Sequence, residues 1–167
     1  MKILYDHKIF YLQKYGGVSN YFINLCNKLK LSHDTKIIAP IYINNYLQKF
    51  DKKNKLTFIK LKKHFKYSRK ISNIINNNFF YNYCKFKKPD IVHLTYFDKE
   101  ICFKKKFKVV VTVYDLIHEI YEKEYNFKYP KSFKYNYLSI ADEIICISEN
   151  TKRDLIKYYN IEEKKIT

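Results

Sequence analysis

The chain has only two glycines, Gly16 and Gly17, and they are adjacent. They lie between a short apolar run at 3–5 and an amphipathic run that begins near Val18. Glycine lets a backbone approach a ligand closely, and the N–H groups of a first helical turn bind anions. The pair therefore predicts a diphosphate site at the start of a helix; the alternative is a tight turn that needs positive φ. A dinucleotide site is disfavoured, because G-x-G-x-x-G is missing and the glycines lie about ten residues past the apolar run.

Polar residues also follow a second apolar run, 91–94. His93 lies within this run and Tyr96 just after it. If 91–94 is a strand of a parallel sheet, its carboxyl end borders the crevice in which such sheets bind ligands. His93 then either faces that crevice or is a satisfied polar residue at the end of the strand, and the sequence favours neither.

The apolar run 109–113 is followed by Tyr114 and Asp115. The Asp115 carboxylate can accept hydrogen bonds from sugar hydroxyls, or it can cap the loop that follows it. His118 and Glu119 come next, on a loop or a short helical turn. Both are residue types that serve as general bases.

Ser148 and Glu149 follow the last apolar run, 143–147. This pair is typical of a helix N-cap with an acidic first turn. The functional alternative is that this helix terminus also faces a ligand.

The elements that position these residues alternate between strand and helix. Continuous apolar runs such as 109–111 indicate strands buried on both faces, as in a parallel sheet. We therefore expect one α/β domain over 1–167, a Rossmann-like, doubly wound parallel sheet with helices on both faces. The helix at 69–84 should place Ile71, Ile74, Ile75 and Phe79 on one face. The expected strands are 2–6, 35–39, 56–61, 91–94, 109–113 and 143–147; the expected helices are 18–30, a weak one at 41–50, 69–84, 130–141 and 149–160, with a loop at 114–129.

The formal net charge of +17 admits a second kind of function, a non-enzymatic basic module that binds nucleic acid or an anionic membrane. However, only Arg69 and Arg153 are arginines, the residue that phosphate and base recognition favours. The excess of Lys, Asn, Ile, Tyr and Phe matches AT-rich codons, so much of the charge is expected on a solvated surface. The basic stretch 60–70, interrupted by Leu61, Phe65 and Tyr67, suits a solvated face or a membrane interface.

Composition also limits the location and the metal chemistry. No apolar run approaches the ~20 residues that span a bilayer, and no signal-peptide pattern follows Met1. We therefore expect a cytoplasmic protein. The four cysteines form no Cys-x-x-Cys pair, so we expect buried thiols and no metal site.

Four stretches together resemble the N-terminal half of retaining GT-B glycosyltransferases, the subfamily 4-like group of the group 1 type. They occur in the order found in that family and extend over nearly the whole chain. They are YGGVSNYFINLCNKL (15–29), PDIVHLTYF (89–97), VVVTVYDLIHEIY (109–121) and ADEIICISENTKRDLIKYYNI (141–161).

The resemblance implies one Rossmann-like half of a two-domain enzyme that transfers a sugar from a nucleotide-sugar to a glycan or lipid-linked hydroxyl, in polysaccharide or lipopolysaccharide assembly. Gly16 and Gly17 match the glycine loop that approaches the donor diphosphate. Tyr114-Asp115 matches a His-Asp pair, with tyrosine in place of the histidine, and a tyrosine carries no titratable proton near neutral pH. No metal or cofactor is implied. The implied catalytic residues are Tyr114, Asp115 and His118, and the implied acceptor or sugar contacts are His93, Tyr96, Glu119, Ser148 and Glu149.

The donor-binding half of the family, with its Glu-x7-Glu motif, has no counterpart in these 167 residues. Sugar transfer needs both substrates held in a closed cleft that excludes water. We therefore expect this chain alone to be inactive and to need a donor domain or partner chain. Its other expected partners are the nucleotide-sugar, the acceptor and, through 60–70, the anionic inner face of the plasma membrane, with no specific nucleic acid.

Overall fold

The structure is a computed structural model that describes residues 1–65, 68–97, 106–121, 124 and 131–167. It divides into two compact units, each described by itself below. Unit 1 comprises Met1–Thr95 and Cys102–Phe107, and unit 2 comprises Tyr96–Ile101 and Lys108–Thr167.

The strands of unit 1 form a parallel sheet in the order β4-β2-β1-β6. In the centre, Tyr5 of β1 lies opposite both Ile37 of β2 and His93 of β6. A separate parallel pair, β3 with β5, continues past the carboxyl end of β2. The strands are β1 (Lys2–Tyr5), β2 (Asp34–Ile38), β3 (Ile41–Tyr42), β4 (Lys55–Leu56), β5 (Ile59–Lys60) and β6 (Ile91–Leu94).

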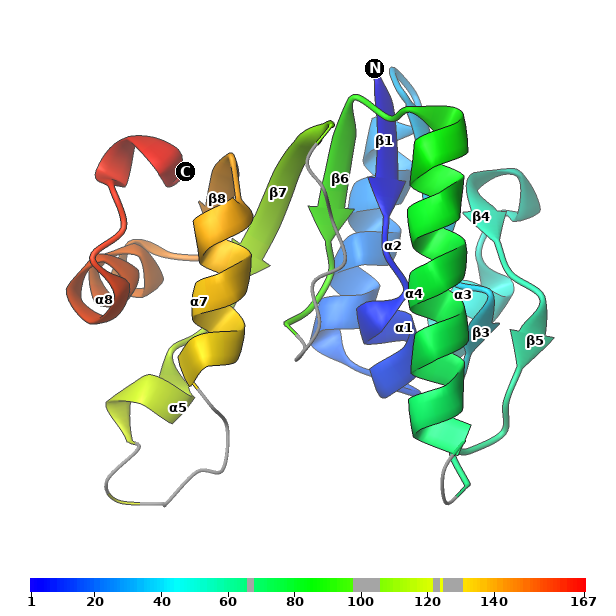
Figure 1. Ribbon diagram of the computed structural model, residues 1–167, viewed down its shortest axis with the longest axis horizontal. Coiled ribbons are helices and arrows are strands. Elements are labelled where there is room, and N and C mark those ends of the chain that lie inside the picture. Colours follow the sequence, from blue (N-terminus) through cyan, green and yellow to red (C-terminus); the bar gives the residue numbers. More distant parts are fainter. Residues whose placement is uncertain (66–67, 98–105, 122–123, 125–130) are drawn as a thin grey trace. The chain divides into compact units, whose positions relative to one another are not determined.

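Helices cover both faces of this sheet: in Figure 1, α4 lies on the near side of the sheet, beside β1 in the view, and α2 lies behind β1. Helix α2 turns Phe22 and Cys26, one helical turn apart, toward the strands, and the Cys26 thiol donates to Thr35 Oγ1 of β2 at 3.3 Å. The helical elements of unit 1 are α1 (Lys8–Leu12), α2 (Gly17–Leu29), α3 (Asn45–Lys49), the 3₁₀ turn η1 (Lys52–Asn54) and α4 (Ser68–Lys87).

The inner stripe of α4 has polar residues at its amino-terminal end. Asn76 is buried there and holds the backbone of β3 twice: Ile41 N donates to Asn76 Oδ1 at 2.9 Å, and Asn76 Nδ2 donates to Ile41 O at 2.8 Å. The full buried stripe is Ser72, Asn76, Phe80 and Cys84. The face expected from the apolar pattern, Ile71, Ile74 and Ile75, lies in solvent instead.

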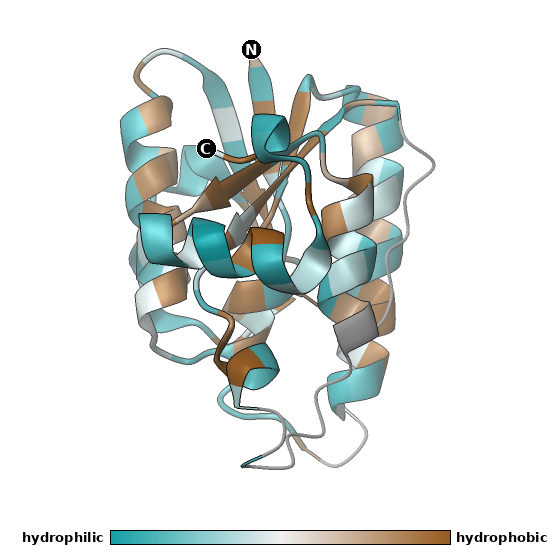
Figure 2. Cartoon of the chain, turned by 90° about the vertical axis from the view of Figure 1, so that its left-hand side faces the viewer, coloured by the Kyte–Doolittle hydropathy of each residue, from teal (hydrophilic) through white to brown (hydrophobic). Residues whose placement is uncertain are grey.

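Unit 2 contains the parallel strands β7 (Lys108–Val113) and β8 (Glu143–Cys146), with Val113 opposite Cys146. Ile166 adds an isolated parallel bridge to Ile144. Figure 2 shows the apolar strands of this unit behind a largely hydrophilic α8. The helical elements are α5 (Ile117–Ile120), α7 (Lys131–Ile140), α8 (Glu149–Tyr159) and η2 (Glu163–Lys165).

The predicted fold class is confirmed: parallel strands alternate with helices in a Rossmann-like α/β arrangement. Besides the face of α4, three local predictions differ from the structure in part. The weak helix predicted at 41–50 is confirmed only over α3, whose N-cap Asn44 accepts from Leu47 N, while Ile41 and Tyr42 form strand β3. The run 56–61 divides between β4 and β5, and the predicted loop 114–129 contains α5, with 122–123 and 125–129 outside the described residues. Within the described ranges, no helix is both long and apolar enough to cross a bilayer.

Candidate functional site

Helix α2 begins at the glycine pair, with Gly16 as its N-cap residue. Gly16 is in extended backbone at φ 169°, and neither glycine lies in the left-handed region that a tight turn would need. The tight-turn alternative for the pair is therefore wrong. The N-cap Gly16 has no side chain to cap the helix, and within the described residues no side-chain oxygen accepts from the N–H groups of the first turn.

The two glycines differ in the space around them. A Cβ added at Gly17 meets nothing within 4 Å, whereas a Cβ at Gly16 would lie 2.1 Å from Gln13 Oε1. Gly17 is also exposed. The first residue of α2 thus borders open space, as a helix terminus that receives a ligand must.

Two hydrogen bonds hold the segment before the glycines against the chain that follows β3. Asn44 Nδ2 donates to Gln13 O at 2.8 Å, and Asn45 N donates to Lys14 O at 3.0 Å. Because this chain lies beyond the carboxyl end of β2, the glycines lie at the sheet edge where parallel sheets bind ligands.

A cavity of about 460 Å³ lies beside this segment. The Lys60 ammonium donates to Asn45 Oδ1 at 2.5 Å and to Gln48 Oε1. Those partners are neutral, and the described lining contains no acid, so the positive charge of the cavity is uncompensated. The lining residues are Lys14, Ile43, Asn45, Gln48, Lys60, Leu61 and Lys62.

Asp6, at the carboxyl end of β1, is buried with 2% exposure. Its Oδ1 accepts from Thr95 N at 2.9 Å and from Thr95 Oγ1, while Thr95 Oγ1 accepts from Ile9 N at 3.1 Å. Burial raises the pKa of the carboxyl to about 6, against the opposing effect of the Thr95 hydrogen bonds. This network connects the ends of β1 and β6 to the start of α1.

His93 is a core residue of unit 1, with 4% exposure. Its ring lies 5.6 Å from that of Tyr5 and 5.0 Å from that of Phe22. Desolvation lowers its pKa to about 3, so the ring is neutral at physiological pH. Its role in sugar binding stays a prediction, and this burial favours the alternative of a satisfied polar residue at a strand end.

In unit 2, the carboxyl ends of β7 and β8 are connected through α8. Thr151 N donates to Ser148 Oγ at 3.2 Å, which confirms Ser148 as the N-cap. The Thr151 hydroxyl in turn donates to Tyr114 O at 3.5 Å. Tyr114 and Ser148 therefore lie at one edge, with Glu149 exposed in the first turn of the helix.

Asp115 is exposed at the same edge, and its Oδ1 accepts from Ile117 N at 3.2 Å. This contact is the loop cap that the sequence offered as an alternative, and it leaves the other carboxylate oxygen available to a ligand's hydroxyl. The pKa of Tyr96 is raised by burial and by the nearby charge of Asp115. Unit 2 thus brings together Tyr96, Tyr114, Asp115, Ser148 and Glu149.

Glu119 lies beneath this edge rather than on it. It is buried and paired with Lys134, whose Nζ lies 2.8 Å from Glu119 Oε1 and donates to Asp115 O at 3.0 Å. The Tyr159 hydroxyl also donates to Glu119. Glu119 is thus placed to position the Asp115 loop through Lys134, while half-buried His118 lies beside it on α5.

Two further observations concern other kinds of site, a metal site and a second cavity. In the part of the chain that the structure describes, no three His, Cys, Asp or Glu side chains gather as a metal site. A larger cavity of about 730 Å³ lies at the other end of α4, lined by Tyr81, Cys84, Lys85, Lys88, Lys106 and Phe107. It is far in the fold from the carboxyl edge and contains none of the predicted site residues.

The family model for Glycosyltransferase Family 4 matches residues 15–167. The chain belongs to glycosyltransferase family 4. No curated protein sequence matches it significantly. A glycosyltransferase from Rickettsia africae ESF-5 has a similar fold, with a TM-score of 0.57 and 22% identity, over 99% of this chain and 41% of that one. The lipopolysaccharide outer core galactosyltransferase WaaB is also similar, with a TM-score of 0.60 and 15% identity, over 100% of this chain and 44% of that one.

These structures confirm the fold, and this family 4 chain spans less than half the length of either. Sequence reasoning missed three features of the carboxyl edges: helix α1, the Asp6–Thr95 network and the lysine cavity. Asp6 did carry a signal, because it ends the first apolar run. Lys14 and Lys60 carried none, because nothing in a lysine-rich sequence marks two distant lysines as neighbours.

Proposed function

We propose that this family 4 chain forms the acceptor-side half of an enzyme that transfers a sugar from a nucleotide-sugar to a hydroxyl of a glycan or lipid-linked acceptor. Polysaccharide or lipopolysaccharide assembly is the proposed pathway. Family membership supports the reaction class. The activity needs a donor-binding half, as a further domain or a partner chain, and no metal or cofactor.

The observation that carries the proposal is the open amino terminus of α2. Among the described residues, no side chain caps its first-turn N–H groups, and Gly17 has no neighbour within 4 Å of where a Cβ would be. A diphosphate there would accept from backbone donors at the positive end of the helix dipole. Such fixed dipoles stabilise the negative charge that develops on the leaving diphosphate.

The carboxyl edge of unit 2 supplies the groups proposed for sugar and acceptor. Asp115 and Tyr96 offer a carboxylate and a phenol that hydrogen-bond hydroxyls, with Tyr114, His118, Ser148 and Glu149 around them. Glu119 and Lys134 act as positioning residues for the Asp115 loop. Tyr114 stands where the family has a histidine, so Asp115 is the titratable group proposed to contact the transferred sugar.

Gly17→Ala tests the proposal in the chain assembled with a donor-binding half. Because an added Cβ meets nothing in the protein, the melting temperature should not fall, while sugar transfer should drop by at least tenfold. Gly16→Ala is the less clean variant, since its Cβ displaces Gln13. Unchanged transfer by Gly17→Ala would show that the glycine is not at the diphosphate.

Peripheral attachment to the inner face of the plasma membrane through 60–70 is a further part of the proposal. Lys62, Lys63 and Phe65 of this stretch are exposed, and residues 66–67, with Tyr67, lie outside the described part. The alternative of a non-enzymatic basic module is not supported by the comparisons. It would require strongly salt-dependent nucleic-acid binding that Gly17→Ala leaves unchanged.

A further inference from the structure

The cavity beside the segment that precedes the glycine pair is lined by side chains from three parts of unit 1. They are that segment, the chain from the end of β3 into α3, and the chain at the end of β5. We call it the lysine cavity. Its volume is about 460 Å³, and its lining is Lys14, Ile43, Asn45, Gln48, Lys60, Leu61 and Lys62.

Backbone hydrogen bonds hold these three parts of the chain together. Tyr42 of β3 lies opposite Lys60 of β5, and Leu61 N donates to Tyr42 O at 2.8 Å. Asn45 N donates to Lys14 O at 3.0 Å. The backbone of the fold therefore sets the positions of the lining residues, which lowers the cost of ordering them around a ligand.

The polar side chains of the lysine cavity offer hydrogen-bond donors. The Lys60 ammonium donates to Asn45 Oδ1 at 2.5 Å and to Gln48 Oε1, which uses two of its three N–H groups. Because both amide oxygens accept from Lys60, the groups that Asn45 and Gln48 have left for a ligand are their N–H donors. Lys14 and Lys62 add two ammonium groups, which can only donate. The polar part of the described lining therefore matches a ligand that accepts.

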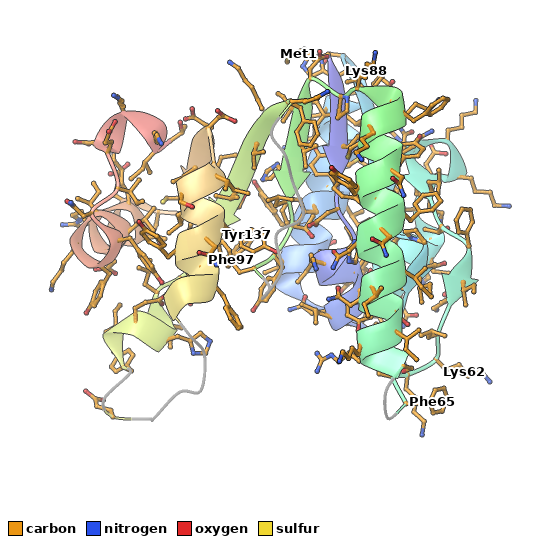
Figure 3. The ribbon with its side chains drawn as sticks, viewed as in Figure 1. Met1, Lys62, Phe65, Lys88, Phe97 and Tyr137 are labelled. Carbon is orange, nitrogen blue, oxygen red and sulfur yellow. The ribbon has the colours of Figure 1, made fainter. Side chains whose placement is uncertain are left out.

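The charge of the lysine cavity has no acid beside it in the described lining. Lys14 and Lys62 are exposed, and Figure 3 shows the Lys62 side chain projecting outward from the segment between β5 and α4. The first 89 residues contain three acids, Asp6, Asp34 and Asp51, and none of them belongs to that lining. The cavity is therefore complementary to an anion in charge as well as in hydrogen bonding.

We propose that the lysine cavity binds an anionic sugar unit of the acceptor, which carries a carboxylate or a phosphate ester, and that the enzyme thereby selects acidic glycans. That this sugar belongs to the acceptor rests on the proposed function; that the cavity binds an anionic sugar does not. Ionised carboxylate and phosphate oxygens accept hydrogen bonds from ammonium and amide groups. A neutral sugar gains no charge attraction from the lysines.

The rest of the lining suits a sugar rather than a bare anion. Ile43 and Leu61 supply apolar side chains for the C–H groups of a sugar ring, and the amides of Asn45 and Gln48 supply donors for its hydroxyls. A volume of about 460 Å³ lies within the range of small-molecule sites. Such sites combine apolar walls with a few polar groups that fix the orientation of the ligand.

The position of the lysine cavity suits an acceptor. Lys14 comes two residues before Gly16, and Asn44 Nδ2 donates to Gln13 O at 2.8 Å in the same segment. An acidic sugar in the cavity would therefore anchor the acceptor near the start of α2, where the donor diphosphate is proposed to lie. The two sites use different residues, so binding of the acidic sugar does not need the donor-binding half.

Calorimetric titration of the 167-residue chain tests the site without any transfer reaction. The probes are a galacturonic acid tetrasaccharide and its carboxyl-reduced form, a galactose tetrasaccharide of the same linkage. We expect the neutral form to bind at least about tenfold more weakly, because it lacks the ionised hydrogen-bond acceptors. Equal affinities would overturn the proposal.

Three smaller probes identify the anionic group: galacturonate, a phosphorylated galactose and inorganic phosphate. Tighter binding of galacturonate assigns a carboxylate to the acceptor, and tighter binding of the phosphorylated sugar assigns a phosphate ester. Inorganic phosphate that binds as tightly as both sugars would overturn the proposal, because the sugar ring would then contribute nothing.

Paired variants separate the cavity from the general positive charge of the chain. Lys14→Gln with Lys62→Gln should weaken binding of the galacturonic acid tetrasaccharide by about tenfold or more. Lys52→Gln with Lys53→Gln removes the same charge from η1 and should have a much smaller effect. All four lysines are exposed, so the variants should fold, as circular dichroism can verify. Equal losses for the two pairs would overturn the proposal.

Gln48→Glu tests the donor-only character of the lining. It places a carboxylate beside Lys60 and should abolish binding of the acidic tetrasaccharide, since like charges repel. Asn78→Glu on α4 adds the same charge outside the lining and should leave binding nearly unchanged. Both positions are exposed, so neither change should disturb the core. Unchanged binding by Gln48→Glu would overturn the proposal.

Two outcomes separate this inference from the proposed function. A nucleotide-sugar that displaces the acidic tetrasaccharide would make the cavity a donor site and overturn the inference, as would equal transfer to acidic and neutral acceptors by the assembled enzyme. Selective binding of the acidic tetrasaccharide without any transfer by the assembled enzyme would overturn the proposed function and leave the anionic sugar site in place.

Discussion

Among the described residues, one carboxylate in each unit is buried near the carboxyl edge, and the two are stabilised differently. In unit 1, Asp6 accepts from the amide and hydroxyl of Thr95. In unit 2, Glu119 faces the ammonium of Lys134 at 2.8 Å. Burial raises the pKa of Asp6 because the hydrogen bonds from Thr95 and the charge of Lys8 offset only part of the free energy of desolvation, whereas the charge of Glu119 is compensated by a buried cation in direct contact. Asp6 is therefore sensitive to pH, and Glu119 is sensitive to the loss of its partner.

The largest expected effect comes from Lys134→Met. It leaves Glu119 buried without a counter-charge, which should lower the free energy of unfolding by about 3–5 kcal/mol. Urea denaturation measures this. Adding Glu119→Gln should recover part of the loss, and Lys157→Met on the exposed side of α8 should cost little. A small loss for Lys134→Met would show that Glu119 is not buried as a charged group.

The pH dependence of Asp6 is the next largest effect. Its folded-state pKa of about 6 exceeds the ordinary 3.8, so the folded chain binds this proton more tightly. The resulting stability is fully present below pH 3.8 and is lost as pH rises to 6, a change of about 3 kcal/mol. Asp6→Asn removes this loss, so the stability of the variant relative to the wild type should rise between these pH values.

Urea denaturation of the wild type and of Asp6→Asn between pH 3.8 and 6 measures the difference between their free energies of unfolding. His93 has its pKa lowered to about 3, so it destabilises the fold as pH falls from 6.5. That contribution is present in both proteins and cancels in the comparison. A difference that does not change with pH would contradict the raised pKa of Asp6.

The smallest expected effect is the loss of a helix cap in unit 2. Ser148→Ala removes the acceptor for Thr151 N and should cost about 1 kcal/mol. Gly16 in unit 1 supplies no side-chain cap to α2. The loss measured for Ser148→Ala therefore gives the stability that the cap adds to α8 and that α2 lacks. Thermal denaturation can resolve this change; no shift at all would indicate that water replaces the serine hydroxyl without cost.

Local patterns predicted those parts of the fold that local physics determines. The continuous apolar run at 109–113, the amphipathic α2 and the Ser148 cap were each readable from neighbouring residues. The Asp6–Thr95 contact was not, because it joins residues 89 positions apart. The faces of α4 could not be assigned either: the apolar stripe of Ile71 and Ile74 suggested the core, but hydrogen bonds from Asn76 to β3 determine which face is buried.

The sequence predicted those residues of the candidate site that directly follow a strand. Tyr114, Asp115 and Ser148 lie at one edge, as expected for residues that follow parallel strands. The burial of His93 and Glu119 depends on aromatic rings and a lysine that come from other elements, which no strand-end pattern reveals.

The central claim is that the open start of α2 receives the diphosphate of a sugar donor, and Gly17→Ala tests it most directly. The measurement is sugar transfer from a nucleotide-sugar by the chain assembled with a donor-binding half, alongside the melting temperature of the chain. The account predicts at least a tenfold loss of transfer with no loss of stability, because the added methyl group occupies ligand space and no protein space. Full transfer by a stable Gly17→Ala enzyme would contradict it.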